Sequence, residues 1–123
     1  MAIIEQIQDN TITKLRLTCE DDDAIKNIKQ VITAIKANSS ILTVHLVDDF
    51  LGCIRNSTRT EIIQALGNVP CLQEVRLEQG LIKVADIAEL LCNVQGLKVL
   101  TVKDVVLQGS EEFFHAAEMA LHS

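Results

Sequence analysis

The sequence predicts an α/β fold in which about four strand–helix units stack as a solenoid, with a parallel sheet on the inner face and helices on the outer face. Three observations predict it: an apolar pattern that recurs along the chain, a helical apolar stripe after each copy, and a nearly all-aliphatic composition. Of the 123 residues, 48% are hydrophobic but only 2% are aromatic. A core of Ile, Leu and Val suits repeated layers of similar thickness, and this length suits one domain.

The recurring pattern places apolar residues at positions one, four and six of a short segment. Positions four and six lie two apart, so on a strand both side chains point to the core, while positions three, five and seven point to the opposite face. Copies that recur every 20 to 50 residues or so are typical of a solenoid. The copies begin 29, 31 and 25 residues apart and read Ile12, Leu15, Leu17; Ile41, Val44, Leu46; Leu72, Val75, Leu77; and Leu97, Leu100, Val102.

Between the copies the apolar period changes from about 2 to about 3.6, which predicts a helix after each strand. Asp22 or Asp23 is expected to cap the first of these helices, and Ser110 the last. Gly67, Asn68 and Pro70 are expected to end the second. The helical segments are residues 24–37, 57–69, 86–94 and 110–123, with the stripes Ile25, Ile28, Ile32, Ile35; Ile62, Ile63, Leu66, Val69; Ile87, Leu90, Leu91, Val94; and Phe114, Ala117, Leu121.

Residues 12–123 make up the predicted repeat domain. In residues 1–11, Ile3, Ile4 and Ile7 predict either a short capping helix or the remnant of a preceding unit. A solenoid needs end caps with a polar outer side, because the apolar surface of its last layer is otherwise exposed to water. No polar cap follows the last predicted helix, so we expect either a fragment of a longer repeat protein or an end surface covered by association.

Two phrases, AIKANSSILTVHL at 34–46 and ALGNVPCLQEVRL at 65–77, resemble the helix-end, turn and strand passage of the leucine-rich repeat family, specifically its ribonuclease-inhibitor-like subclass. The resemblance extends over residues 12–123. It implies an interaction module, since the family generally binds proteins and has no shared catalytic centre. The phrase AIKANSSILTV is also similar to short repeat domains of tropomodulin-like actin regulators.

The chain departs from this family at position nine of each copy. The family usually carries Asn or Cys there, and that side chain bonds backbone groups in the turn that leaves the strand. Because this chain has other residues at the position, irregular turns are expected. The equivalents are Glu20, Asp49, Gly80 and Val105.

Charge and motifs exclude several classes of function. The net charge of −6 repels phosphate backbones and anionic membrane surfaces. No apolar run reaches the roughly 18 residues that cross a bilayer, and MAIIEQIQDN lacks the basic start of a secretory signal. A nucleophile elbow, a phosphate-binding glycine loop and an HExxH motif are all lacking. We therefore expect a cytoplasmic protein that is no enzyme, uses no cofactor, and binds neither nucleic acid nor membrane.

The metal-binding residue types also lack a metal-binding arrangement. The acidic run at 20–23 lacks the spaced ligands and glycine of a calcium loop, so it is expected to be a solvated helix start. The histidines His45, His115 and His122 lie in different units. The cysteines Cys19, Cys53, Cys71 and Cys92 form no CxxC pair. We expect no metal, and reduced, mostly buried thiols in a cytosol-like compartment, with a disulfide left open.

The outward strand positions predict the binding surface, because equivalent positions on neighbouring strands form rows about 4.8 Å apart. The row at position five contains Arg16, His45 and Arg76. These residues either grip an acidic partner surface or pair with acids on the sheet itself, as Arg76 would with Glu74 and Glu78. The predicted partner-binding residues are Lys14, Arg16, Thr43, His45, Glu74, Arg76, Glu78, Val99, Thr101 and Lys103.

Apolar residues on outward or semi-exposed places are either surface scatter or a patch that another subunit covers. They are Leu42, Val47, Val99 and Val106. The sequence therefore predicts a non-enzymatic module that binds a partner protein through its strand face. The alternative is a structural subunit of a larger assembly, homo-oligomers included, or a fragment of a longer repeat protein, with its end layers buried by neighbours.

Overall fold

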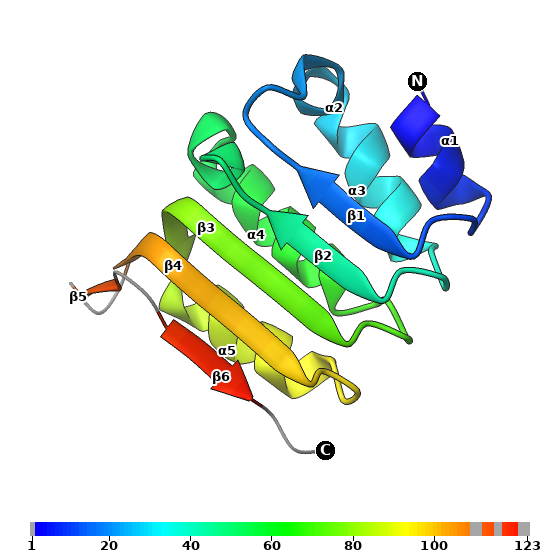
Figure 1. Ribbon diagram of the computed structural model, residues 1–123. Helices are drawn as coiled ribbons and strands as arrows, with labels where there is room; N and C mark the ends of the chain where they lie inside the picture. The colour runs from blue at the N-terminus through cyan, green and yellow to red at the C-terminus, as the bar shows by residue number, and fades with distance from the viewer. Residues whose placement is uncertain (1, 109–111, 115–116, 121–123) are drawn as a thin grey trace.

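The computed structural model describes residues 2–108, 112–114 and 117–120, and these form one sheet with helices on a single face (Figure 1). In chain order the elements are α1 (Ala2–Gln8), β1 (Lys14–Leu17), α2 (Asp22–Lys26), α3 (Ile28–Lys36), β2 (Thr43–Leu46), the 3-10 helix η1 (Phe50–Cys53), α4 (Asn56–Leu66), β3 (Glu74–Lys83), α5 (Val84–Asn93), β4 (Val99–Gln108), β5 (Glu112–Phe114) and β6 (Ala117–Ala120).

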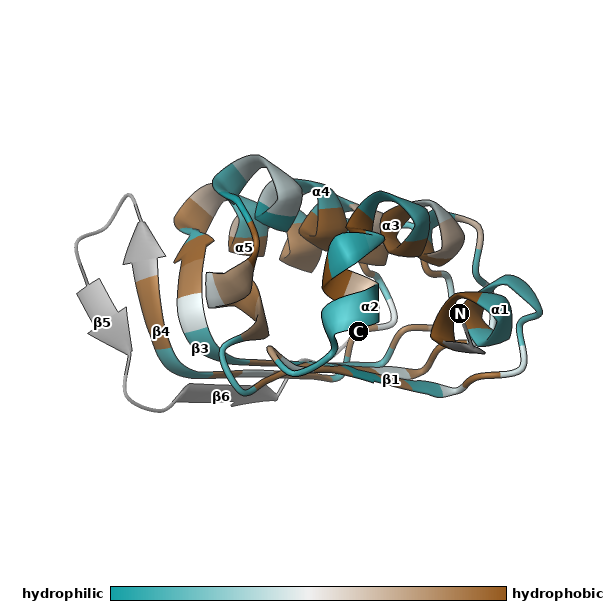
Figure 2. Cartoon of the chain, turned by 90° about the horizontal axis from the view of Figure 1, so that it is seen from above, coloured by the Kyte–Doolittle hydropathy of each residue, from teal (hydrophilic) through white to brown (hydrophobic). Residues whose placement is uncertain are grey.

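The first four strands are parallel neighbours in chain order, which confirms the predicted sheet. Leu15 lies opposite Val44, Val44 opposite Val75, and Val75 opposite Leu100. Equivalent positions of the four copies therefore stand side by side. Positions four and six of every copy are buried between the sheet and the helix layer, which Figure 2 shows on one side of the strands.

The helix predicted over 24–37 is interrupted at Asn27, which ends α2 and precedes α3. The Asn27 side chain donates to the carbonyl of Asp23 at 2.9 Å, so it bonds the backbone in place of continuing the helix. The predicted cap by Asp22 or Asp23 is wrong, because Asp21 holds that position. The break also moves the stripe: Ile25 and Ile28 are only half-buried. The fully packed residues of α3 are Val31, Ile32, Ala34 and Ile35.

The second and third stripes agree better with the sequence. All the predicted apolar residues of α4 are buried, and the helix ends at Leu66, before Gly67. Leu90 in α5 and Val94 directly after it are buried, but Leu91 is 37% exposed, so its predicted inward position is wrong. The buried face of α5 instead begins at Asp86, whose carboxylate accepts a hydrogen bond from the Thr60 hydroxyl at 2.9 Å.

β3 and β4 continue beyond the predicted strands, past a bend, and this corrects the expectation of turns at Gly80 and Val105. These two residues pair with one another in the extended ladder. Pairing in the ladder thus satisfies the backbone groups at these two positions. In the family that the sequence resembles, an Asn or Cys side chain bonds the equivalent groups. Gly80 has φ 118°, and a Cβ there would lie 2.9 Å from Gly52 N and from Leu51 Cβ. The bend therefore requires glycine.

The helix predicted over 110–123 is wrong where the structure describes this segment. Its parts form β5 and β6, which pair antiparallel with β4: Phe114 lies opposite Val105, and Ala117 opposite Val102. The outer edge of β4 exposes unpaired backbone groups, and a returning strand satisfies them where a helix would not. The outer edge of β4 is therefore paired within the chain. The predicted cap Ser110, the stripe residue Leu121, and the histidines His115 and His122 lie outside the described residues.

A disulfide joins Cys19, after β1, to Cys53 in η1, with a Cα–Cα distance of 6.1 Å. The expected reduced, mostly buried thiols are therefore wrong for this pair, and Cys71 and Cys92 are free but exposed. The register explains the bond, because parallel neighbours bring the segments after β1 and β2 together. Since such bonds persist in oxidising compartments, the predicted cytoplasmic location gains no support here.

Asn38 fastens the turn between α3 and β2 to the N-terminal helix. Its side chain is 2% exposed and makes hydrogen bonds of 2.8 Å to three backbone groups. The amide nitrogen donates to the carbonyl of Ile7, while the oxygen accepts from the amides of Ser40 and Ile41. One side chain therefore sets the end of α1, the turn and the start of the second unit.

Replacing Asn38 by Ala should lower the free energy of unfolding by at least about 2 kcal/mol, because the buried backbone groups that Asn38 bonds would lose their hydrogen-bond partner. Urea unfolding followed by circular dichroism measures this loss. Ser39→Ala, on an exposed neighbouring side chain, is the matched control and should stay within about 0.5 kcal/mol of wild type. Equal stability of the two variants would contradict the fastening role of Asn38.

Removing the disulfide with the double variant Cys19→Ser/Cys53→Ser should lower the free energy of unfolding by about 2 to 4 kcal/mol, since the bond closes a long loop. The separation of its cysteines is 34 residues. A reducing agent should produce the same loss in wild type and none in the variant. Cys71→Ser is the control for a free, exposed thiol. Four titratable thiols in the untreated wild-type protein would contradict the bond.

Candidate protein-binding face

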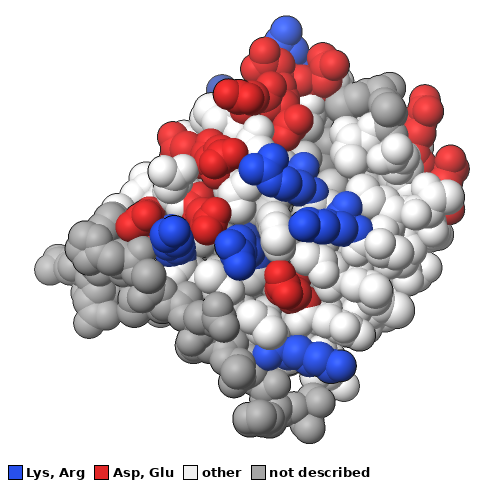
Figure 3. All heavy atoms as spheres, viewed as in Figure 1, with Lys and Arg blue, Asp and Glu red and all other residues white. Residues whose placement is uncertain are grey.

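The face of β1–β4 opposite the helices carries the residues that the sequence predicted for binding; we call it the open face (Figure 3). The strand register brings all ten together in rows. One row runs Lys14, Thr43, Glu74, Val99, the next Arg16, His45, Arg76, Thr101, and a third pairs Glu78 with Lys103. All of these side chains are exposed or half-buried. Rigid strands therefore position every predicted residue on one surface.

The three basic residues of the second row contact acids of the same chain. Arg16 Nη2 lies 3.1 Å from Asp48 Oδ2, and His45 Nε2 lies 3.0 Å from Glu74 Oε2. Arg76 Nη1 lies 3.5 Å from Glu78 Oε1. Of the two interpretations drawn from the sequence, pairing within the sheet describes the isolated chain. The partners differ in part, because Glu74 contacts His45 and not Arg76.

Asp48 also belongs to the open face, although it is not among the residues predicted from the sequence. It follows β2 and has φ 51°, a left-handed conformation that Asp tolerates better than most side chains. From this turn its carboxylate reaches back to Arg16 on the neighbouring strand. The sequence signal was the pair Asp48–Asp49 directly after a strand, where acidic residues favour turns.

These ion pairs leave the open face able to rearrange. The side chains of Arg16 and Asp48 are 55% and 63% exposed, and exposed pairs typically contribute 0 to about 1 kcal/mol. Arg76 is also incompletely satisfied, because its buried Nε makes no hydrogen bond within the described chain. A partner can therefore replace the present contacts at small cost. Figure 3 shows both signs of charge interspersed over the strands, with acids gathered toward α2.

The apolar residues suspected of forming a patch do not gather in one place. Val47 is buried, at 3% exposure, so its predicted outward position is wrong. Leu42 and Val106 are exposed, but Leu42 precedes β2 whereas Val106 lies in the far half of β4. Val99 is half-buried. Surface scatter describes these residues better than a patch that a subunit covers.

Arg59 on α4 is a buried cation that holds structure together on the opposite side of the sheet from the open face. Its Nη1 donates to the carbonyls of Leu51 at 2.8 Å and Ile54 at 2.6 Å, and its Nη2 donates to Asn56. Burial lowers the pKa of this guanidinium. Arg59 therefore anchors both η1, which ends at the disulfide cysteine Cys53, and the segment that leads from η1 to α4.

The described part of the chain contains neither a candidate metal site nor a helix that could span a membrane. There, no three His, Cys, Asp or Glu side chains are grouped so that they could hold a metal ion. None of the helices in these residues is long and apolar enough to span a membrane. The acidic run at 20–23 starts α2 and lines a surface hollow of about 610 Å³.

No protein family model and no curated protein matches the chain. Among solved structures, one described as Leiomodin-1 Actin-Binding Site 2 is similar, with a TM-score of 0.62 and 13% sequence identity. The match covers 89% of this chain and 63% of that one, so this chain spans less than two thirds of its structural neighbour. At such low identity the likeness shows the fold alone. The chain thus has an α/β fold with a four-stranded parallel sheet, similar to that of the leiomodin fragment.

Proposed function

We propose that this chain is a leucine-rich-repeat-type solenoid that binds a partner protein through its open face and performs no catalysis. The observation that carries the proposal is the register of β1–β4, which places equivalent outward residues of four units in continuous rows that none of the described helices covers. The repeated strand–helix order along the chain supports the solenoid. The family resemblance and the fold of the neighbour support a role in protein interaction.

The charges of the open face indicate what a partner must offer. Since Arg16, His45 and Arg76 already have acidic partners, binding exchanges those contacts for new ones. A matching surface presents carboxylates to Arg16 and Arg76, and cations to Asp48 and Glu78. Arginine is enriched among residues that dominate binding energy, because its planar guanidinium binds a carboxylate through two parallel hydrogen bonds.

Actin is the first partner to test. The structural neighbour is described as an actin-binding site, and the match extends over 89% of this chain. Identity of 13% carries no binding residue across, so the choice rests on shared fold and on the interaction surface described above.

The double variant Arg16→Ala/Arg76→Ala should weaken partner binding at least about tenfold, the equivalent of about 1.4 kcal/mol. The measurement is affinity capture from native lysate with quantitative mass spectrometry, alongside a titration with purified actin. Wild type and variant should unfold within about 1 kcal/mol of one another, because exposed ion pairs add little stability.

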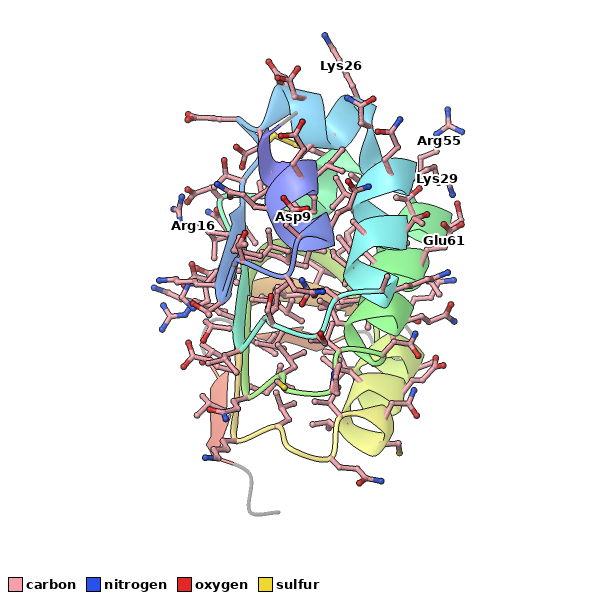
Figure 4. All side chains as sticks on the ribbon, turned by 90° about the vertical axis from the view of Figure 1, so that its right-hand side faces the viewer. Asp9, Arg16, Lys26, Lys29, Arg55 and Glu61 are labelled. Carbon is pink, nitrogen blue, oxygen red and sulfur yellow. A yellow bond between two sulfur atoms is a disulfide. The ribbon has the colours of Figure 1, made fainter. Side chains whose placement is uncertain are left out.

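The matched control is Lys29→Ala, which removes an ion pair of the same kind from the helical side of the molecule. Lys29 Nζ lies 2.7 Å from Glu61 Oε2, and Figure 4 shows both residues on the side away from Arg16. This control should capture the same proteins as wild type. Identical capture by the double variant would contradict the proposed use of the open face. Light scattering that shows an obligate oligomer at all concentrations would favour the structural-subunit alternative.

A further inference from the structure

The outer edge of β1 is a strand edge with free backbone groups. Among the described residues, β1 pairs with β2 alone. Thr43 N donates to Thr13 O and Val47 N to Leu17 O, both at 3.1 Å, so alternate residues of β1 bond to β2. In a parallel pair the intervening residues point their N–H and C=O groups the other way. The backbone groups of Lys14 and Arg16 therefore face outward, away from β2.

This edge differs from the opposite one, which β5 and β6 cover. On the β1 side the helix layer extends one element further than the sheet. Helix α1 packs beside α3, but no described strand lies beside β1 (Figure 1). None of the described strands therefore takes the place that a further strand would have beside β1. The surface hollow of about 610 Å³ begins here, between Ile3 of α1, Arg16 and Leu17 of β1, and Ala24 of α2.

The turn after β1 limits the length of the free edge. Asp21 Oδ2 accepts a hydrogen bond from the amide of Thr18 at 2.7 Å, so the next outward amide is already satisfied. Beyond it, Glu20, Asp22 and Asp23 also line the hollow. A strand that pairs with β1 therefore meets two free residues, Lys14 and Arg16, and then an acidic turn.

The charges of the side chains at the β1 edge indicate which kind of strand can pair there. The exposed side chains at this edge are Lys14 and Arg16, and Lys14 makes no ion pair with a described residue. A second copy of the chain that paired β1 with β1 would place these cations against their equivalents, which is unfavourable. Within the sheet, by contrast, His45 meets Glu74 of the next strand. An added strand with acidic residues on the open face continues that arrangement.

We propose that the β1 edge binds an extended segment of a partner protein in which acidic and apolar residues alternate. The segment adds a further parallel strand by pairing with the backbone of Lys14 and Arg16. Its carboxylates face those two side chains, and its apolar residues enter the hollow against Ile3 and Ala24. A basic residue at its C-terminal end meets the acidic turn. Backbone pairing supplies affinity, and the alternating side chains supply specificity. This site shares Lys14 and Arg16 with the open face but does not use His45, Arg76 or the other open-face residues.

The probe is the synthetic peptide acetyl-Val-Glu-Val-Glu-Val-Lys-Lys-amide, titrated into the ¹⁵N-labelled full chain and followed by NMR. Saturable shift changes should be confined to residues around β1 and the hollow. Hydrogen exchange at the amides of Lys14 and Arg16 should become at least about tenfold slower, because both amides enter a ladder. The charge-reversed peptide acetyl-Val-Lys-Val-Lys-Val-Glu-Glu-amide should not bind.

Two variants at Lys14 distinguish the contribution of backbone pairing to peptide binding from the contribution of the side-chain charge. Lys14→Pro removes an outward N–H that β2 does not use, whereas Lys14→Ala removes only the side chain. The proline variant should lose at least about tenfold more affinity than the alanine variant. Arg76→Ala on the open face should bind the peptide as wild type does, so failure here and failure of the proposed function are distinguishable.

Peptides N-methylated at alternate residues test the same point without altering the protein, should the proline variant not fold. One methylation register should abolish binding and the other should preserve it, since only alternate amides face β1. Three results would overturn the proposal: no saturable binding, equal binding of the charge-reversed peptide, or binding without protection of Lys14 and Arg16.

Discussion

The structure depends on burying at least two side chains from each of four parallel strands against one layer of helices. Leu15, Val44, Val75 and Leu100 have no exposed surface, and each lies opposite the next. Since side chains alternate along a strand, a slip of one residue in any pair would turn its apolar residues to water. The core therefore permits one register, and that register determines the rows of the open face and the stacking of the turns.

The two ends of the sheet differ, and this difference organises the interaction surfaces. At one end β5 and β6 return to cover β4, while at the other no described strand pairs with the outer edge of β1, which lies beside a helix and a hollow. The bonds that fasten the early units gather near the free edge: Asn38 holds α1 to the turn before β2, and the disulfide joins the segments after β1 and β2. The chain thus stiffens the end at which it presents unpaired backbone. A rigid edge loses less conformational entropy when a further strand binds.

Local spacing was enough to predict the four parallel strands and the residues of the open face, because a period of 2 assigns each side chain to one side of the sheet without knowledge of its neighbours. It was not enough where partners distant in sequence decide the structure. The segment around Phe114 has a stripe that fits a helix, yet it pairs with β4, whose unpaired edge no local pattern reveals. Cys19 and Cys53 meet only because two turns stack. The partner of Arg16 was missed for the same reason, since Asp48 reaches it from another strand through a left-handed turn.

The most direct test of this account is the order of the strands in solution. Nuclear Overhauser effects between labelled methyl groups should connect Leu15 with Val44, Val44 with Val75, and Val75 with Leu100. Backbone contacts between the same strands should follow the parallel pattern. Methyl contacts that join Leu15 directly to Val75, or an antiparallel pattern between any two of these four strands, would contradict the shared register and with it both proposed surfaces.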